Sequence, residues 1–266
     1  MLNKSKGNMT TQQRYQQSEK GKETSEYGDR ITAKRSNLMA MNKVKQGSQR
    51  YPWVTHTWNV VKGKCPHDCS YCYMKRYPQP KLHFDEKSLS NGLGDENTIF
   101  VGSSCDMWAS FIPNQWIERT IFRCFEYNKN HYLFQSKNPI RFLDYTDIFP
   151  DNVWLGTTIE TNRHYDFISL APNTDERRHA IQELNYPIMI SIEPIMDFDL
   201  DVMVKWIQDI APHFVSIGAD SGNNNLPEPS SGKTKALISA LKEITEVKVK
   251  DNLSRLLEGE VIKESE

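Results

Sequence analysis

Three cysteines stand close together in the first third of the chain, in the segment Cys65-Pro-His-Asp-Cys69-Ser-Tyr-Cys72. Three thiolates in one short loop can ligate three of the four irons of a cubane [4Fe–4S] cluster. The fourth iron is then left without a protein ligand. An open coordination position is what a metal centre needs in order to bind a substrate or a cofactor. We therefore predict that Cys65, Cys69 and Cys72 are the metal ligands of a [4Fe–4S] cluster.

A structural zinc site is the alternative for these cysteines. Zinc would need a fourth ligand, and His67 lies within the loop. The spacing C-x3-C-x2-C differs from the paired C-x2-C of zinc ribbons, however, and the sequence has no second pair. The spacing therefore favours an iron–sulfur cluster over zinc.

An apolar stretch precedes the cysteines, and the aromatic Tyr71 stands just before the last of them. A motif C-x3-C-x-aromatic-C after a first strand resembles the signature of the radical S-adenosylmethionine (SAM) superfamily. The chain also resembles a phage-associated radical SAM family of unknown function, and distantly spore photoproduct lyase. The segments that carry the resemblance span about residues 57–222 and read TWNVVKGKC, CSYCYMKR, IFVGSSCDMW, LFQSKNP, VWLGTTIET, ISIEPIM and SIGADSG.

The resemblance implies a chemistry and a set of partners. SAM would bind the open iron, and one electron from the cluster would cleave SAM to a 5′-deoxyadenosyl radical that abstracts a hydrogen atom. A reductant such as flavodoxin or ferredoxin would supply the electron. The substrate stays open, and a nucleic acid or a protein could close the mouth of so small a catalytic domain. The competing function is a nucleic-acid-binding protein whose metal site is structural or redox-sensing.

Polar residues that follow the expected strands are candidates for SAM contacts. Ser103, Ser104 and Asp106 come after the strand expected at 98–102. The superfamily usually has a Gly-Gly-Glu-like segment here for the methionine amine, so Asp106 would take the place of the acid. Lys137 could pair with the SAM carboxylate, although a solvated loop lysine is nearly as good an interpretation.

Two later strands add further candidates. Thr158 and Glu160 share one strand face, and a hydroxyl beside a carboxylate suits a ribose diol. Glu193 ends an almost purely apolar strand, where an unpaired buried carboxylate would be costly. We expect Glu193 to meet SAM, substrate or Lys250. Tyr71, the aromatic of the signature, is also expected to contact the cofactor.

Cys105 is the candidate catalytic residue outside the cluster loop. It follows a strand and has the polar neighbours Ser104 and Asp106. A thiol near the radical could donate a hydrogen atom to a substrate radical, as the distant resemblance to photoproduct repair would allow. The alternative is an ordinary buried cysteine that packs as a small apolar residue.

These residues need a scaffold that brings strand ends together. Strands are expected at 54–61, 98–102, 131–135, 153–159, 187–192, 213–218 and 247–250, and helices at 114–128, 174–185, 200–211 and 234–245. Alternation of this kind predicts an α/β fold with parallel strands and right-handed crossovers. The units are too few for a full eight-stranded barrel, so we expect a partial (β/α)6 TIM-like radical SAM barrel with the cluster at its C-terminal mouth.

Charge and composition divide the chain into three parts. Residues 1–50 hold 11 Lys/Arg and 4 Asp/Glu, a net charge of +7, whereas the whole chain has a net charge of −1. We predict a basic, largely disordered tail at 1–50, the barrel at 51–258 and a C-terminal tail at 259–266. No stretch is apolar and long enough to be a leader or a membrane span, and the cysteines form no secreted disulfide pattern. We therefore expect a cytoplasmic protein without a membrane partner.

Overall fold

The computed structural model describes residues 41–44, 51–166 and 168–258. Most of the predicted N-terminal tail and the whole predicted C-terminal tail, 259–266, lie outside the described residues. The expectation of a largely disordered tail at 1–50 therefore stays a prediction.

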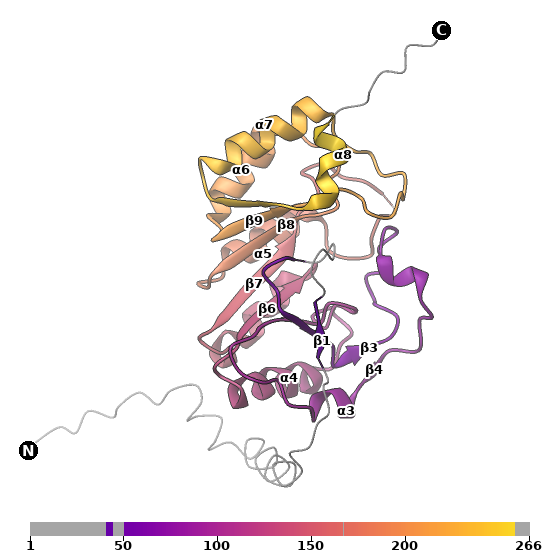
Figure 1. Cartoon of the computed structure of the whole chain (residues 1–266), viewed down its shortest axis with the longest axis vertical. Coiled ribbons are helices and arrows are strands. Elements are labelled where there is room, and N and C mark those ends of the chain that lie inside the picture. Colours follow the sequence, from indigo (N-terminus) through magenta and orange to yellow (C-terminus); the bar gives the residue numbers. More distant parts are fainter. Residues whose placement is uncertain (1–40, 45–50, 167, 259–266) are drawn as a thin grey trace, which may run out of the picture.

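An eight-stranded sheet forms the centre of the molecule, in the order β1-β2-β5-β6-β7-β8-β9-β10 (Figure 1). From β2 to β10 every neighbouring pair is parallel, and only β1 is antiparallel, at the edge beside β2. The strands are β1 Asn42–Lys43, β2 His56–Trp58, β5 Thr98–Val101, β6 His131–Ser136, β7 Val153–Thr158, β8 Ile188–Ile192, β9 Phe214–Ile217 and β10 Glu246–Val249. This mostly parallel sheet confirms the predicted α/β class, and the closure of the sheet as a partial barrel stays a prediction.

Helices follow the parallel strands and pack on one side of the sheet (Figure 1). The long ones are α4 Asn114–Glu126, α5 Thr174–Gln182, α6 Leu200–Ile210 and α7 Ser231–Lys242, with short helices α3 Glu86–Leu89 and α8 Ser254–Leu257. Three 3-10 segments join them, η1 Tyr73–Arg76, η2 Pro139–Ile148 and η3 Asp251–Leu253. None of the described helices is long and apolar enough to cross a membrane.

The start of the barrel differs from the prediction in two ways. Asn42 and Lys43, inside the predicted tail, form β1 and pair with β2. The single strand expected at 54–61 is wrong, because the chain leaves the sheet after Trp58. Val61–Lys62 (β3) instead pairs with His83–Phe84 (β4) in a separate two-stranded sheet. The cysteine loop is thus held between the two strands of a hairpin-like excursion from the main sheet.

Helix starts follow local capping chemistry. The side chain of Asn173 accepts a hydrogen bond from the backbone of Glu176, and the Glu176 side chain accepts from the backbone of Asn173, a reciprocal capping box that begins α5 as predicted. Helix α7 begins three residues earlier than expected, because Ser230 caps it through the backbone N–H of Lys233.

Apolar side chains cover both faces of the sheet. The larger core lies between the strands and the helices and includes Trp58, Trp108 and Phe134, each fully buried. On the other face, Tyr51 and Val54 pack against Leu133, Met189 and Phe214. The segment just before β2 therefore closes the side of the sheet that carries no helix.

Candidate active site

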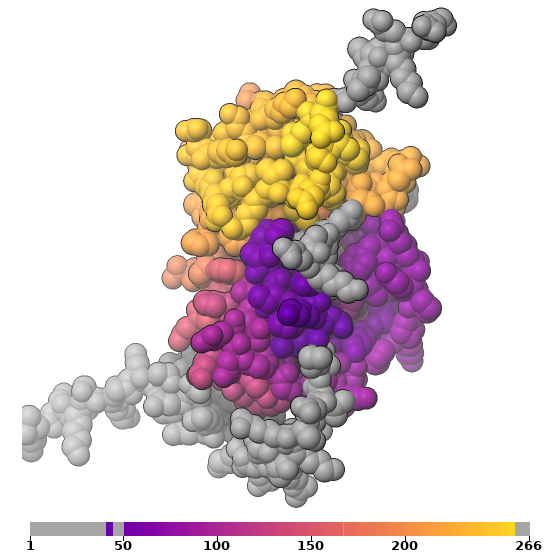
Figure 2. All heavy atoms as spheres, in the orientation of Figure 1, coloured from indigo at the N-terminus to yellow at the C-terminus, as the bar shows by residue number. Residues whose placement is uncertain are grey.

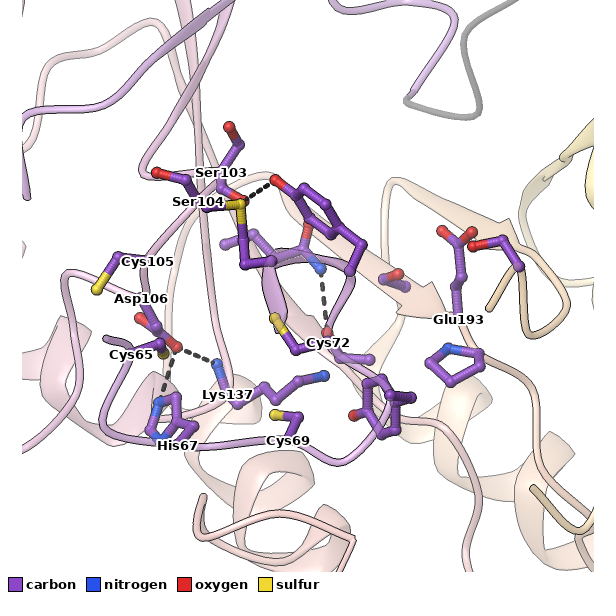
Figure 3. Close-up of a pocket in the computed structure, with 18 of the residues that line it drawn as sticks. Cys65, His67, Cys69, Cys72, Ser103, Ser104, Cys105, Asp106, Lys137 and Glu193 are labelled. Carbon is purple, nitrogen blue, oxygen red and sulfur yellow. Dashed lines mark hydrogen bonds and ion pairs between the residues drawn. The ribbon is translucent and has the colours of Figure 1, made fainter. Parts of the chain in front are cut away.

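A cavity of about 540 Å³ lies where the parallel strands end. Its wall includes the three motif cysteines and most of the polar residues that the sequence analysis selected for the cofactor. Figure 3 shows the cysteines, Ser103, Ser104 and Asp106 on one side of the cavity and Glu193 on the other. The lining residues from that selection are Cys65, Cys69, Tyr71, Cys72, Ser103, Ser104, Cys105, Asp106, Lys137, Thr158 and Glu193.

All five cysteines are free thiols. Within the described part of the chain, no three His, Cys, Asp or Glu side chains converge closely enough to hold one metal ion. In a cubane each thiolate binds a different iron, so its ligands surround a cluster rather than a single point. A hydrogen bond from Cys105 lowers the pKa of Cys65 to about 6. Burial raises the pKa of Cys72.

Asp106 binds the cysteine loop from the end of β5. Its Oδ2 lies 2.9 Å from His67 Nε2, inside the loop, and accepts hydrogen bonds from the Ser136 hydroxyl at 2.9 Å and the Lys137 backbone N–H at 2.8 Å (Figure 3). Its Oδ1 accepts from the backbone N–H of Trp108. Burial acts to raise the pKa of Asp106, but the contact with His67 and these hydrogen bonds hold it below the usual value. Both oxygens of this carboxylate therefore have protein partners.

Glu160 binds the same loop from the end of β7. The hydroxyl of Tyr71, between the second and third cysteines, donates to Glu160 Oε1, and Lys137 Nζ lies 2.8 Å from that oxygen. Arg177 of α5 donates to Oε2 at 2.9 Å and to the carbonyl of Thr158 at 3.0 Å. Burial acts to raise the pKa of Glu160, yet Arg177 and Lys137 lower it to about 2.

Two carboxylates thus hold two residues of the cysteine loop, one on each side of Cys69. Lys137 joins them, because its backbone N–H binds Asp106 and its ammonium group binds Glu160. The predicted contacts of Asp106 with the SAM amine and of Glu160 with the ribose stay predictions. The partners that the structure gives both carboxylates are protein groups.

Sequence reasoning missed Arg177 and the loop-holding role of His67. Arg177 is only 4% exposed although it follows the first turn of a capped helix, a position that is normally solvated. A buried arginine calls for a buried partner. That rule, applied to the apolar stripe of α5, could have found the pair.

Gly102 and Asn59 position the two serines that follow β5, Ser103 and Ser104. Gly102 has a φ of +81°, a conformation that favours glycine, and it turns the chain out of the strand. The side chain of Asn59 then accepts from the Ser104 backbone at 2.9 Å and from the Ser103 hydroxyl at 3.3 Å. The two serines are consequently held beside the cysteines at the cavity wall.

Glu193 lies on the opposite wall and contacts Lys250, one of the three partners predicted for it. Lys250 Nζ lies 2.9 and 2.7 Å from its two oxygens, and Asn252 donates to Oε1 at 3.1 Å. The carboxyl group lies directly over Gly218, where a β-carbon would come within 2.7 Å of it. The side chain of Glu193 is 19% exposed and still faces the cavity.

Tyr51 contributes to the floor between the two walls. Its hydroxyl donates to Gln135 Oε1 at 2.7 Å and lies 3.0 Å from Ser191 Oγ. Gln135 in turn donates to the hydroxyl of Thr158 at 3.0 Å. Thr158 therefore lines the cavity as part of a hydrogen-bond chain, and its contact with the SAM ribose stays a prediction.

Cys105 lies in the cavity wall beside Cys65 and is 3% exposed. A hydrogen bond to Cys65, together with burial, raises its pKa far above the ordinary value. Cys105 is thus a neutral thiol at the cavity. Cys124, in contrast, is buried in α4 and donates to the carbonyl of Thr120.

The donor set fits a [4Fe–4S] cluster with one open iron. Three free thiols belong to one loop, and a cavity with hydroxyl, carboxylate and ammonium groups lies next to them. Such groups match the amine, carboxylate and ribose that SAM presents.

Similarity to solved structures defines the class of fold. A cysteine-to-serine mutant of spore photoproduct lyase is 9% identical, with 89% of this chain and 95% of that one covered at a TM-score of 0.57. Streptococcus suis SuiB bound to S-adenosylmethionine is 8% identical, with 73% and 50% covered at 0.53. The fold is therefore similar to radical SAM folds.

The chain belongs to the family described as "Protein of unknown function (DUF5131)", whose model matches residues 48–231. These residues include the cysteine loop and all strands from β2 to β9. No curated protein matches the sequence.

Proposed function

We propose that the protein is a radical SAM enzyme with a [4Fe–4S] cluster on Cys65, Cys69 and Cys72. The observation that carries the proposal is a single cavity lined by three motif thiols and by polar strand-end residues, in a fold similar to radical SAM folds. The bound cluster and SAM would supply the radical that abstracts hydrogen from the substrate.

The residues of the cavity have separate tasks. The hydroxyls of Ser103 and Ser104 and the ammonium group of Lys137 lie on the cysteine side and are suited to the methionine end of SAM. Thr158, deeper in the cavity, is suited to a ribose hydroxyl. Glu193 and Lys250, on the far wall, orient SAM or the substrate.

Cys105 is the proposed hydrogen-atom donor. Its thiol lies in the cavity wall beside Cys65, within the site where the substrate radical would form. In that step the S–H bond breaks homolytically, the substrate radical gains a hydrogen atom, and a thiyl radical remains on Cys105. The radical must then be reduced by one electron and one proton, for which a flavodoxin or ferredoxin is the proposed electron source.

Anaerobic reconstitution with iron and sulfide tests the proposal. We expect iron–sulfur absorption near 400 nm, and 5′-deoxyadenosine after SAM and dithionite are added. Cys124→Ala is the matched control and should give the same yield, because Cys124 lies in α4 away from the cavity. A stable cluster that leaves SAM intact would contradict the enzyme and favour a redox-sensing protein.

A further inference from the structure

The rim of the cavity has features that the radical chemistry does not use. Directly after Cys72, the 3-10 helix η1 places Tyr73, Met74 and Arg76 at the rim, followed by Tyr77. Tyr73 is 40% and Tyr77 is 59% exposed. Tyrosine is enriched at binding interfaces, because it combines a large apolar ring with a polar hydroxyl.

These rim residues separate two adjoining cavities. A second cavity of about 300 Å³ shares five lining residues with the main one, namely Tyr73, Met74, Tyr77, Ser103 and Ser104. Asn42 of β1 and Lys62 of β3 complete part of its wall. An extended ligand could therefore pass over the tyrosines, with one unit in each cavity.

The tyrosine rim is held in shape before any ligand arrives. The Tyr73 hydroxyl donates to the carbonyl of Ser103 at 2.9 Å (Figure 3), and the Tyr77 backbone N–H donates to Met74. Gln79 donates to the same Met74 carbonyl at 2.5 Å. The Tyr73 ring, fixed through its hydroxyl, can stack on a partner at a small cost in conformational entropy, and the backbone contacts position Tyr77 beside it.

Charge at the rim is positive. Residues 61–83 contain four lysines and one arginine against a single acid, Asp68. Asp68 pairs with Lys75 at 3.0 Å and lies 3.5 Å from Lys64. Among the described residues, Arg76 has no ion-pair partner, and its Nη2 would lie 3.2 Å from a β-carbon at Gly222, in the loop after β9. In Figures 1 and 2 this purple segment faces the orange loop that follows β9.

Exposed aromatic rings, a guanidinium without an ion-pair partner among the described residues, and two adjoining cavities form a combination suited to single-stranded nucleic acid. Bases stack on aromatic side chains, and basic groups beside them follow the phosphates. An acidic peptide would use the charges but has no need of the two tyrosines. Lys43 follows Asn42 of β1, which lines the second cavity, and adds one basic residue to that strand.

We propose that the rim formed by Tyr73, Arg76 and Tyr77 binds single-stranded nucleic acid, with one base stacked at the rim and its neighbour in the main cavity. The proposal rests on the proposed function, because it makes that neighbouring nucleotide the substrate of the radical reaction.

Fluorescence anisotropy with a labelled oligonucleotide of about twelve nucleotides tests the proposal on the reconstituted full chain. Oligothymidylate and oligouridylate distinguish DNA from RNA, and binding of either supports the proposal. Tyr77→Ala should weaken binding about fivefold or more, whereas Tyr77→Phe keeps a stacking ring and should stay near the parent. Arg76→Gln should reduce the slope of log K against log salt by about 0.7.

Matched controls are exposed residues away from the rim. Phe111→Ala removes an aromatic side chain that is 86% exposed, and Lys235→Gln removes a charge on the exposed side of α7. Neither should change the affinity. Equal losses in these controls, equally tight binding of polyglutamate, or no binding of either oligonucleotide would overturn the proposal. Formation of 5′-deoxyadenosine by a parent protein that binds no oligonucleotide would refute the rim alone and leave the enzyme intact.

Discussion

The carboxylates that follow strand ends on the two sides of the cavity differ in how far they are buried. On the cysteine side, Asp106 lines the cavity and Glu160 lies behind the lining residues; both carboxylates have both oxygens bonded to protein groups, and the side chain of Glu160 is 3% exposed. On the opposite wall, Glu193 is bound by Lys250 and Asn252 and remains 19% exposed towards the cavity.

The difference teaches that position at a strand end does not by itself decide what a carboxylate does. Fully paired carboxylates fix the loop that would hold a metal cluster, because a misplaced ligand costs metal affinity. Glu193 also has both oxygens bonded, to Lys250 and Asn252, but it is more exposed at the cavity and so remains accessible to a ligand. If this division between the carboxylates is right, substitutions at Asp106 and Glu160 should affect the cysteine loop, and substitution of Glu193 should affect ligand binding.

The largest effect is expected from substitution of the three cysteines of the loop. Alanine at Cys65, Cys69 or Cys72 should each abolish iron–sulfur absorption and SAM cleavage, because each thiolate has its own iron to ligate. Iron content and 5′-deoxyadenosine yield are the measurements. A full iron complement with activity in any one variant would refute the proposed cluster.

Glu160→Gln should lower the free energy of unfolding by about 3–5 kcal/mol, because it leaves the buried Arg177 without its counter-ion. Urea denaturation of the parent and the variant measures the change. Glu160→Gln should also hold less cluster, since the amide offers one acceptor oxygen to three donors, Tyr71, Lys137 and Arg177. If SAM affinity falls while stability and iron content stay at the parent level, the ribose assignment is right and the anchoring role is wrong.

Acid should weaken the same anchor. The pKa of Glu160 is about 2 in the folded protein, below its ordinary value of 4.5, so protonation opposes folding. The stability that ionised Glu160 contributes, about 3 kcal/mol, is present above pH 4.5 and is lost as the pH falls towards 2. The stability difference between the parent and Glu160→Gln should therefore shrink between pH 7 and pH 3. A constant difference over that range would contradict the linkage.

Asp106→Asn should have a smaller effect of about 1–3 kcal/mol. The amide keeps one acceptor oxygen but brings an NH2 group against donors such as Ser136 or the Lys137 backbone. Thermal unfolding and iron content should both fall. The outcome that would break the comparison is unchanged iron content together with a loss of SAM binding, as expected of an amine ligand.

Glu193→Gln should change stability least, by about 1–2 kcal/mol, since it loses one ion pair at a partly open wall. Iron content should stay at the parent level while the affinity for SAM or substrate falls. Anaerobic titration with SAM, alongside iron analysis, checks both. A loss of iron here would show that both walls hold the loop and that the division is false.

The alternating strands and helices were predictable from the sequence, but the side-chain contacts between distant segments were not. Strands β5 to β9 lie where β-branched apolar runs predict them, because a parallel strand buried on both faces has a near-continuous apolar sequence. The strand after Val54 was misjudged, since the break at Asn59 depends on hydrogen bonds to Ser103 and Ser104, more than 40 residues away.

For the site, too, the residues were predictable from the sequence but their contacts were not. Ten residues chosen for cofactor or catalysis line the cavity together with the signature tyrosine, because strand ends of a parallel sheet share one edge. The sequence did not show which side chain each of these residues would contact. His67 and Asp106 are 39 residues apart, and Glu160 selects Arg177 from a helix that sequence alone shows only as amphipathic.

Tyr51 has a consequence for how the protein is made. Its hydroxyl meets Gln135 and Ser191, which follow it by 84 and 140 residues. During synthesis, Ser191 leaves the ribosome well after Cys72, by about 6–24 seconds at ordinary elongation rates. The three thiols therefore leave the ribosome before Gln135 and Ser191, to which Tyr51 is hydrogen-bonded in the folded protein. If the three thiols hold the proposed cluster, the complete site can form only after β8 has emerged from the ribosome.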